Sequence, residues 1–205
     1  MKLTLNAGGA IELIFPTVIH TLDIAAFKTV QKDLIKHVYN EKKKDSKGRQ
    51  ISNVGGWQSG AKSFKEPNLL SKLIQLEVGK YFHANKILKD TIKLTFDNYW
   101  ININRKGDFN TKHIHQHGHL SGVMYLQVPK DSGNIGFDSP HAFTHAGEND
   151  AYSDNIREAC CTYPFFGFAP KAGNILMFPS SLYHAVEPSR SEEDRISASF
   201  NLHLI

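Results

Sequence analysis

Apolar residues recur every three or four positions in two stretches of the first 90 residues, which is the spacing of one helix face. The first stretch follows Asp23, a candidate N-cap, and ends in the run Lys42–Lys44. The second covers residues 68–82. The pattern therefore predicts two amphipathic helices before residue 90. In the first helix the apolar positions are Ile24, Phe27, Val30, Leu34 and Val38.

From Ile92 onward the apolar period changes from the helical spacing to two, the period of a half-buried strand. The alternation shifts phase between Phe96 and the run YWININ at 99–104, so we expect a β-bulge near Asp97 and Asn98. The fold class indicated is mostly β with flanking helices, the helices being packed outside a β-sandwich or barrel. Further strands are expected at 113–116, 121–128, 133–137, 174–178, 184–187 and 195–203.

Four histidines stand at every second position, at 113, 115, 117 and 119. Residues two apart share one face of a strand, so two imidazoles could close on one metal ion. All four could not, since the set would span roughly 20 Å at about 3.3 Å per residue. A third ligand has to come from elsewhere, and His184 is the candidate. The pattern therefore predicts a metal site formed by His113, His115 and His184.

The other histidines are expected to have lesser roles. His117 and His119 flank a glycine, which favours a surface or substrate-contact role on a turn. His141 and His145 lie in the polar segment 139–164, which could be a lid or a solvated insertion. The tryptophans at 57 and 100 are expected to be core residues.

The last predicted strand carries a candidate anion site. Arg195, Ser197 and Ser199 share one face, and the apolar residues between them share the other. An arginine fork beside a hydroxyl suits a carboxylate, although a surface ion pair with Glu192 or Glu193 is the alternative. A metal site about one hairpin from this arginine suggests a chelating cosubstrate with a distal carboxylate, which is the geometry that 2-oxoglutarate requires.

With these features the chain resembles the iron(II)/2-oxoglutarate-dependent oxygenases, and among them a group of uncharacterised members from marine bacteria and phages. The resemblance rests on a series of short motifs. No single motif is specific, but the order of the motifs is, and together they cover most of the chain. The motifs are SNVGGWQS at 52–59, WININ at 100–104, HIH at 113–115, LSGV at 120–123, YL at 125–126, SG at 132–133, FPS at 178–180, His184, RIS at 195–197 and FN at 200–201.

The resemblance implies a double-stranded β-helix (a jelly-roll, cupin-like barrel) with the N-terminal helices outside it. It implies one oxygenase domain over 1–205, with helical support at 1–90 and the jelly-roll core at 91–205. The implied activity uses iron(II), 2-oxoglutarate and O₂ to hydroxylate an unknown small molecule or protein side chain, releasing succinate and CO₂.

By the same resemblance, His113, His115 and His184 are the metal ligands. Arg195 and Ser197 would hold the cosubstrate, with Tyr125 as a further donor. One feature departs from the family pattern, because an Asp or Glu usually stands where this chain has His115. Three neutral imidazoles would leave the full +2 charge on the metal, and zinc, copper or nickel could compete strongly. Alternatively, Asp108, Asp131 or Asp138 supplies a carboxylate ligand. His115 would then not bind the metal itself but would contact the residues that do.

Two other functions remain open at this point. One is a cupin-type metalloprotein whose three-histidine site works without 2-oxoglutarate. The other is a non-catalytic module on the same fold that binds a carboxylate through Arg195.

Composition adds only limits. A content of 40% hydrophobic and 21% charged residues is that of an ordinary globular protein. There is no apolar run of about 18 residues and no secretory pattern at the start, so we expect a cytoplasmic protein without membrane partners, in the host cytoplasm if phage-encoded. The net charge of +4 is small for a chain of this length, and it does not indicate a nucleic-acid partner. Cys160 and Cys161 are adjacent, which excludes a disulfide framework and a Cys-based zinc site of normal spacing.

Overall fold

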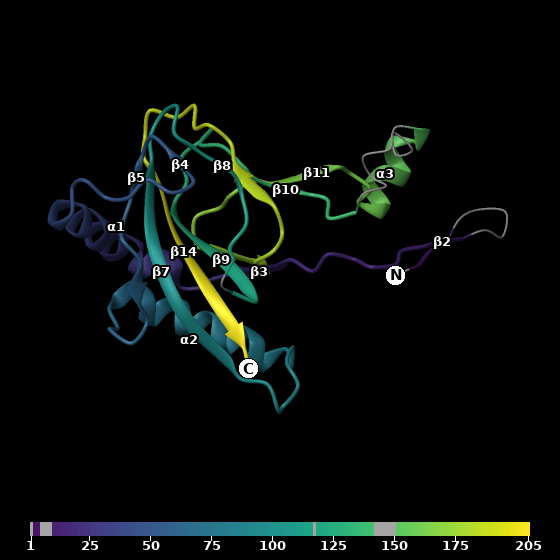
Figure 1. Ribbon diagram of the computed structural model, residues 1–205, viewed down its shortest axis with the longest axis horizontal. Coiled ribbons are helices and arrows are strands. Elements are labelled where there is room, and N and C mark those ends of the chain that lie inside the picture. The colour runs from purple at the N-terminus through teal and green to yellow at the C-terminus, as the bar shows by residue number, and fades with distance from the viewer. Residues whose placement is uncertain (1, 5–9, 117, 142–150) are drawn as a thin grey trace.

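The computed structural model describes residues 2–4, 10–116, 118–141 and 151–205. Two antiparallel sheets dominate this part of the chain (Figure 1). The larger sheet has, in spatial order, β3 (His20–Asp23), β12 (Asn174–Pro179), β9 (Leu120–Gln127), β14 (Arg195–Leu204), β7 (Leu94–Asn104) and β5 (Trp57–Gln58), with β6 (Lys62–Ser63) also paired to β7. The smaller sheet has the order β11 (Phe165–Phe168), β10 (Ile135–Asp138), β13 (His184–Val186), β8 (Phe109–His113) and β4 (Asn53–Val54).

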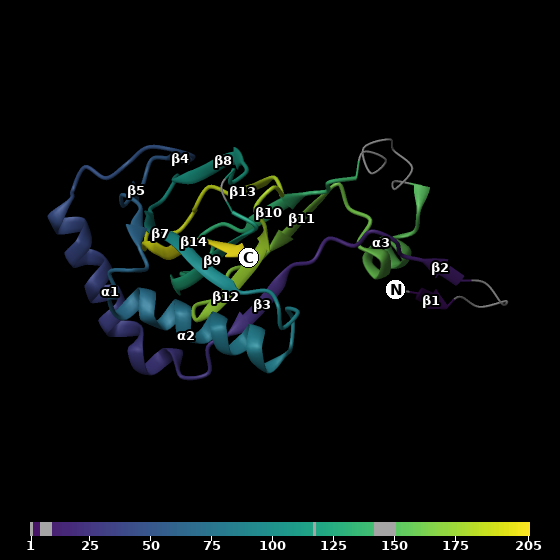
Figure 2. The same ribbon diagram turned by 60° about the horizontal axis from the view of Figure 1, so that its bottom comes forward.

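Two long helices, α1 (Phe27–Lys44) and α2 (Leu69–Ala84), lie against one face of the larger sheet (Figures 1 and 2). Asn68 caps α2, since its side chain accepts hydrogen bonds from the backbone N–H groups of Leu70 and Ser71 at 3.0 and 3.1 Å. The expectation that Asp23 caps α1 is wrong. Asp23 is the last residue of β3, in register with Asn174, and α1 starts four residues later without a side-chain cap.

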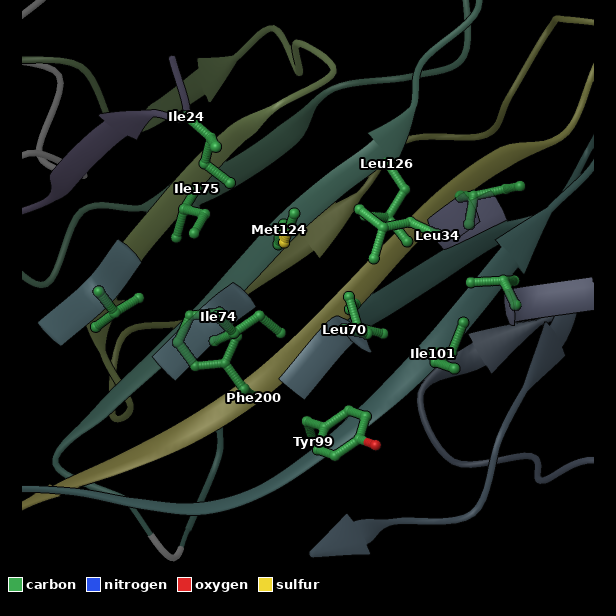
Figure 3. Packing of buried hydrophobic residues seen from close by; sticks show 14 of the residues in the cluster. Ile24, Leu34, Leu70, Ile74, Tyr99, Ile101, Met124, Leu126, Ile175 and Phe200 are labelled. Atoms are coloured by element: carbon green, nitrogen blue, oxygen red, sulfur yellow. The ribbon is translucent and has the colours of Figure 1, made fainter. Parts of the chain in front are cut away.

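The main core fills the space between these helices and the larger sheet (Figure 3). Phe200 of β14 and Met124 of β9 point into it and are fully buried, as are Leu34 and Ile74 of the two helices. Burying a side chain of this size contributes about 1.5–3 kcal/mol. A second, smaller cluster lies on the other face of the larger sheet, between the two sheets, and consists of Val123, Tyr125, Ile135, Phe137, Leu176, Phe178 and Leu182.

The bulge expected from the phase shift is present in β7. Phe200 pairs with Tyr99 and Leu202 pairs with Phe96, so Asp97 and Asn98 together oppose the single residue Asn201. The extra residue restores the apolar side chains on both halves of the strand to the helix-covered face.

Six elements of the structure were not predicted from the sequence: β3, β4, β5, β6, α3 and β11. The sequence did not predict strands β3 to β6 within residues 20–63; β4 belongs to the smaller sheet, and the other three belong to the larger sheet. Segment 139–164, interpreted from the sequence as a lid or a solvated insertion, contains α3 (Asp154–Cys160) and leads into the unpredicted edge strand β11. Residues 142–150 with His145, and His117, lie outside the described residues. A short hairpin of β1 (Lys2–Thr4) and β2 (Ala10–Glu12) completes the described strands. None of the described helices is long and apolar enough to cross a lipid bilayer.

Candidate metal centre and anion pocket

The smaller sheet brings two distant histidines together. His113 ends β8 and His184 begins β13, and the two residues are paired in the antiparallel register. Their ring centroids lie 4.3 Å apart. Strand pairing across 71 positions of sequence therefore builds the first two corners of the cluster.

His115 joins the cluster from outside the strand. The strand expected at 113–116 ends at His113, because the backbone N–H of His115 bonds instead to the carbonyl of Ser180 at 2.9 Å, in the turn before β13. The His115 ring lies 5.3 Å from that of His113 and 5.1 Å from that of His184. One ring nitrogen of each of the three histidines lies within 4.8 Å of the other two.

For two of the three rings, hydrogen bonds to backbone carbonyls determine which nitrogen faces the cluster. Nδ1 of His113 lies 2.7 Å from the Thr111 carbonyl oxygen, and Nδ1 of His184 lies 2.9 Å from that of Leu182. A carbonyl oxygen only accepts, so Nδ1 carries the proton and Nε2 keeps its lone pair. Metal-binding histidines are normally oriented by such contacts.

All three rings are in the form that binds metals. Burial lowers the pKa of His113 and of His115, and it lowers the pKa of His184 to about 3. The rings are therefore neutral at neutral pH. This donor set of three neutral imidazoles fits a divalent transition metal such as iron(II).

The alternative carboxylates lie elsewhere. Among the described residues no Asp or Glu belongs to the cluster. Asp138 forms an ion pair with Lys112, and Asp108 accepts a 2.6 Å hydrogen bond from the backbone of Arg105. The carbonyl of Asp131 accepts one from the backbone of Arg190.

The anion site lies on the larger sheet, on the face turned toward the histidines. On β14 this face carries Arg195, Ser197, Ser199 and Asn201, while the residues between them enter the helix-covered core. Ser197 pairs with Tyr125 on one side and with Asn102 on the other. All of these except Asn201 line one pocket together with the three histidines.

Arg195 is a buried cation. Its side chain is 3% exposed and donates to the carbonyls of Ser132 and Gly133 and to Oδ1 of Asn104, at 3.2–3.4 Å. Its Nε has no partner in the described structure, where no carboxylate lies within ion-pair distance of the guanidinium either. The alternative of a surface ion pair with Glu192 or Glu193 does not describe this residue. A buried charge without a counter-ion favours an anionic ligand.

Tyr125 lies in the same part of the pocket, and its burial raises the pKa of its hydroxyl to about 12. The phenol is therefore protonated and can donate. Burial also lowers the pKa of Arg195, but a guanidinium remains charged in a protein.

Other residues singled out in the sequence are placed differently. His119 accepts a 2.9 Å hydrogen bond from the backbone of Leu204 and is not part of the cluster. Trp57 is in the main core, as expected, but the core assignment of Trp100 is wrong. Trp100 lines the pocket with its ring 5.3 Å from that of His115. Sequence reasoning missed Asn102, although it alternates with the core residues of β7 in WININ.

Comparison with known proteins gives the family. A model described as "Putative 2OG-Fe(II) oxygenase" matches residues 98–201, just over half of the chain, while no curated protein sequence matches. Among solved structures, the α-ketoglutarate-dependent carbocyclase SnoK from nogalamycin biosynthesis is 12% identical with a TM-score of 0.63, covering 91% of this chain and 79% of its own. A prolyl-4-hydroxylase from Pseudomonas putida is 14% identical with a TM-score of 0.59. The match covers 90% of this chain and 92% of the hydroxylase chain.

A third structure, the viral collagen prolyl hydroxylase of Paramecium Bursaria Chlorella virus-1, is 17% identical with a TM-score of 0.56, over 90% of this chain and 94% of its own. At such identities the three structures show the fold alone, and they confirm the expected double-stranded β-helix with helices outside it. The family follows from the sequence model, whose matched residues include the histidine cluster and Arg195: the chain belongs to the 2-oxoglutarate- and iron(II)-dependent oxygenases.

Proposed function

We propose that the protein is a dioxygenase in which His113, His115 and His184 hold iron(II) while Arg195 and Ser197 hold the distal carboxylate of 2-oxoglutarate. One observation carries the proposal. Three neutral imidazoles, of which His184 is buried and the other two are half-buried, line the same pocket between the two sheets as one buried cation without a carboxylate partner. A ligand with a chelating end and an anionic end fits both.

When bound, iron(II) would supply the chemistry of O₂ activation. One oxygen atom of O₂ would go to 2-oxoglutarate as it is converted to succinate and CO₂, and the other would be inserted into a C–H bond of the substrate. The substrate proposed is a small molecule or a protein side chain.

The chain's own residues would bind and orient the cosubstrate, and they would exclude water from the pocket. Arg195 would donate to the distal carboxylate, with the hydroxyls of Ser197 and Tyr125 as further donors on the neighbouring strand positions. The apolar side chains of Phe178 and Ile135 line the same pocket and keep water out. In such a low-dielectric site the charge of Arg195 acts more strongly than it would in water.

The test is succinate formation from 2-oxoglutarate by the purified protein with iron(II), ascorbate and air, alongside binding of 2-oxoglutarate under anaerobic conditions. His184→Ala should abolish turnover, and Arg195→Met should weaken 2-oxoglutarate binding at least tenfold. The matched control is Arg190→Gln, which removes an exposed arginine of the same turn and should change neither quantity.

The two other candidate functions give different results. A cupin-type enzyme would bind metal but would show no 2-oxoglutarate binding and no effect of Arg195→Met beyond stability. A carboxylate-binding module would bind 2-oxoglutarate equally well after His184→Ala. Absence of both turnover and 2-oxoglutarate binding in the iron-loaded protein would refute the oxygenase proposal.

The proposal has two further parts. We propose that residues 1–205 act as one oxygenase unit, with the first 90 residues supporting the barrel. We also propose a cytoplasmic location, since iron(II) and the free thiols of Cys160 and Cys161 both favour a reducing compartment.

A further inference from the structure

His115 is held differently from the other two histidines. Its Nδ1 contacts side chains rather than a carbonyl of the backbone: Oδ1 of Asn201 at 2.9 Å and Oγ of Ser121 at 2.6 Å. Asn201 and Ser121 are buried and paired across β14 and β9. Hydroxyls and amides can donate as well as accept, so these contacts alone leave the tautomer of His115 undetermined.

The next hydrogen-bond partner, Asn98, determines in which direction these side chains donate and accept. The side-chain amide of Asn98 contacts Asn201 at 3.0 Å with one end and the carboxylate of Asp97 at 3.1 Å with the other. An ionised carboxylate only accepts, so the NH₂ group of Asn98 has to face Asp97. Its oxygen then faces Asn201, whose own NH₂ group donates to it.

This orientation leaves only Oδ1 of Asn201 to face His115. An amide oxygen accepts, so Nδ1 of His115 carries the proton and Nε2 presents its lone pair to the cluster. Ser121 fits the same arrangement, because its hydroxyl can donate to Oδ1 of Asn201 at 3.0 Å or contact Ser180 at 2.8 Å. The carboxylate of Asp97 thus sets the direction of every amide between itself and the ring.

The bulge in β7 makes this network possible. Asp97 and Asn98 are the two residues that oppose Asn201 there. In a regular ladder a single residue would stand opposite Asn201, so one strand position could not supply both the amide and the carboxylate.

We propose that Asp97, Asn98 and Asn201 form a hydrogen-bond relay that orients His115 as a metal ligand through Nε2. The inference rests on the proposed function, since it assumes that the three histidines bind a metal. Asn201 is in this view a positioning residue. It fixes the tautomer of the one ligand that replaces the usual carboxylate, a task that backbone carbonyls perform for His113 and His184.

The test uses cobalt(II) in place of iron, with proton NMR of the loaded protein and a cobalt affinity from competition with a chelating dye. Each imidazole bound through Nε2 should give one strongly shifted N–H signal that disappears in D₂O, three in all. His115→Ala identifies the signal of that ring. Asn201→Leu should remove it or make it exchange rapidly with solvent, and should weaken cobalt binding about 10- to 100-fold.

Two further variants and one control separate the orientation of His115 from mere folding of the protein. Asn201→Asp keeps an acceptor oxygen toward His115 and should retain all three signals. Asp97→Asn removes the acceptor-only end of the relay and should accelerate solvent exchange of the His115 signal alone. Asp90→Asn, the same charge change at an exposed position, should leave all three signals unchanged.

The outcomes are distinguishable. Three unchanged signals with unchanged cobalt affinity in Asn201→Leu would overturn the relay while leaving the three-histidine site intact. An unchanged exchange rate in Asp97→Asn would also overturn it. Fewer than three exchangeable signals in the unaltered protein would refute the ligand set itself, and the relay with it.

Discussion

By the resemblance to iron oxygenases, His115 stands where they usually carry Asp or Glu. As a metal ligand, its neutral ring would leave the whole charge of a divalent ion uncompensated. Within the described part of the chain, no carboxylate compensates it from another position. Imidazole ligands suit zinc, copper, nickel and iron, whereas carboxylates suit harder ions such as manganese(II). The side chain at this single position should therefore influence which metal the site prefers.

His115→Asp tests that influence. We expect the preference for zinc(II) over manganese(II) to fall by about tenfold or more, because a carboxylate replaces one imidazole and lowers the net charge of the site. Competition titrations of the two ions against a chelating dye measure the ratio. His119→Asp, outside the cluster, is the control and should leave the ratio unchanged; the same ratio in both variants would show that His115 is not a ligand.

At the scale of elements, two glycines show how the strands differ in freedom. A Cβ on Gly122 of β9 would lie 2.2 Å from the ring of Phe200, which is fully buried in the main core. A Cβ on Gly136 of β10 would lie 1.8 Å from the ring of Phe165, which is 44% exposed on the edge strand β11. The first ring cannot move without disturbing the core, whereas the second can turn into solvent.

We therefore expect Gly122→Ala to lower the free energy of unfolding by about 1–3 kcal/mol, the usual cost of overpacking a core. Gly136→Ala should cost clearly less. Urea unfolding of both variants gives the comparison. Equal losses, or a larger loss at Gly136, would contradict this account of the two strands.

Helix α1 is joined to β6 by an ion pair. Glu41 lies 2.6 Å from Lys62 of β6 and 2.7 Å from Lys44. Hydrogen bonds from Lys44 and Lys62 lower the pKa of Glu41 to about 2, against an ordinary value of 4.5. A lowered carboxyl pKa adds stability above the ordinary value, and that stability is lost as the pH falls from about 4.5 toward 2.

Glu41→Gln should accordingly cost about 1 kcal/mol of unfolding free energy at pH 6–7, since solvent screens a pair at the surface. The difference from the unaltered protein should shrink below pH 4.5 and vanish near pH 2. Urea unfolding at several pH values measures it. Glu77→Gln, which breaks a pair with Lys80 within α2, is the control; a difference at Glu41 that grew on acidification would contradict the assignment.

At the scale of the whole molecule, the pocket lies between the two sheets and draws on both. The smaller sheet contributes His113 and His184, and the larger sheet contributes Arg195 and Tyr125. A ligand that contacts both the metal and Arg195 therefore bridges the two sheets, and binding it should stabilise the molecule as a whole.

We expect 2-oxoglutarate at 100 times its dissociation constant to stabilise the metal-loaded protein by about 2.7 kcal/mol. For a chain of this size that raises Tm by about 5–10 °C. Differential scanning calorimetry under nitrogen measures the shift. Without metal, or in Arg195→Met, the shift should be small; an equal shift in the metal-free protein would indicate a ligand held by Arg195 alone.

Local pattern was sufficient for much of the fold. Helix and strand periods, the bulge at Asp97 and Asn98, and the two-faced strand from Arg195 to Phe200 follow from side-chain alternation, which depends only on neighbouring residues. The start of α1 was predicted wrongly because a tertiary contact, the pairing of β3 with β12, takes Asp23 into a strand. The unpredicted β11 depends on a partner strand in the same way.

For the site, the sequence by itself determined which residue types were available: the histidine series, a distal His184, and an arginine and serines on one strand face. Only the tertiary structure decided that the rings of His113, His115 and His184 meet and that Arg195 is buried without a counter-ion. It also showed that the candidate carboxylates Asp108, Asp131 and Asp138 do not belong to this cluster. The metal and cosubstrate roles of these residues stay predictions. The physical reason for the division is that alternation is local, whereas distance, burial and hydrogen-bond polarity depend on strands that pair across many positions of sequence.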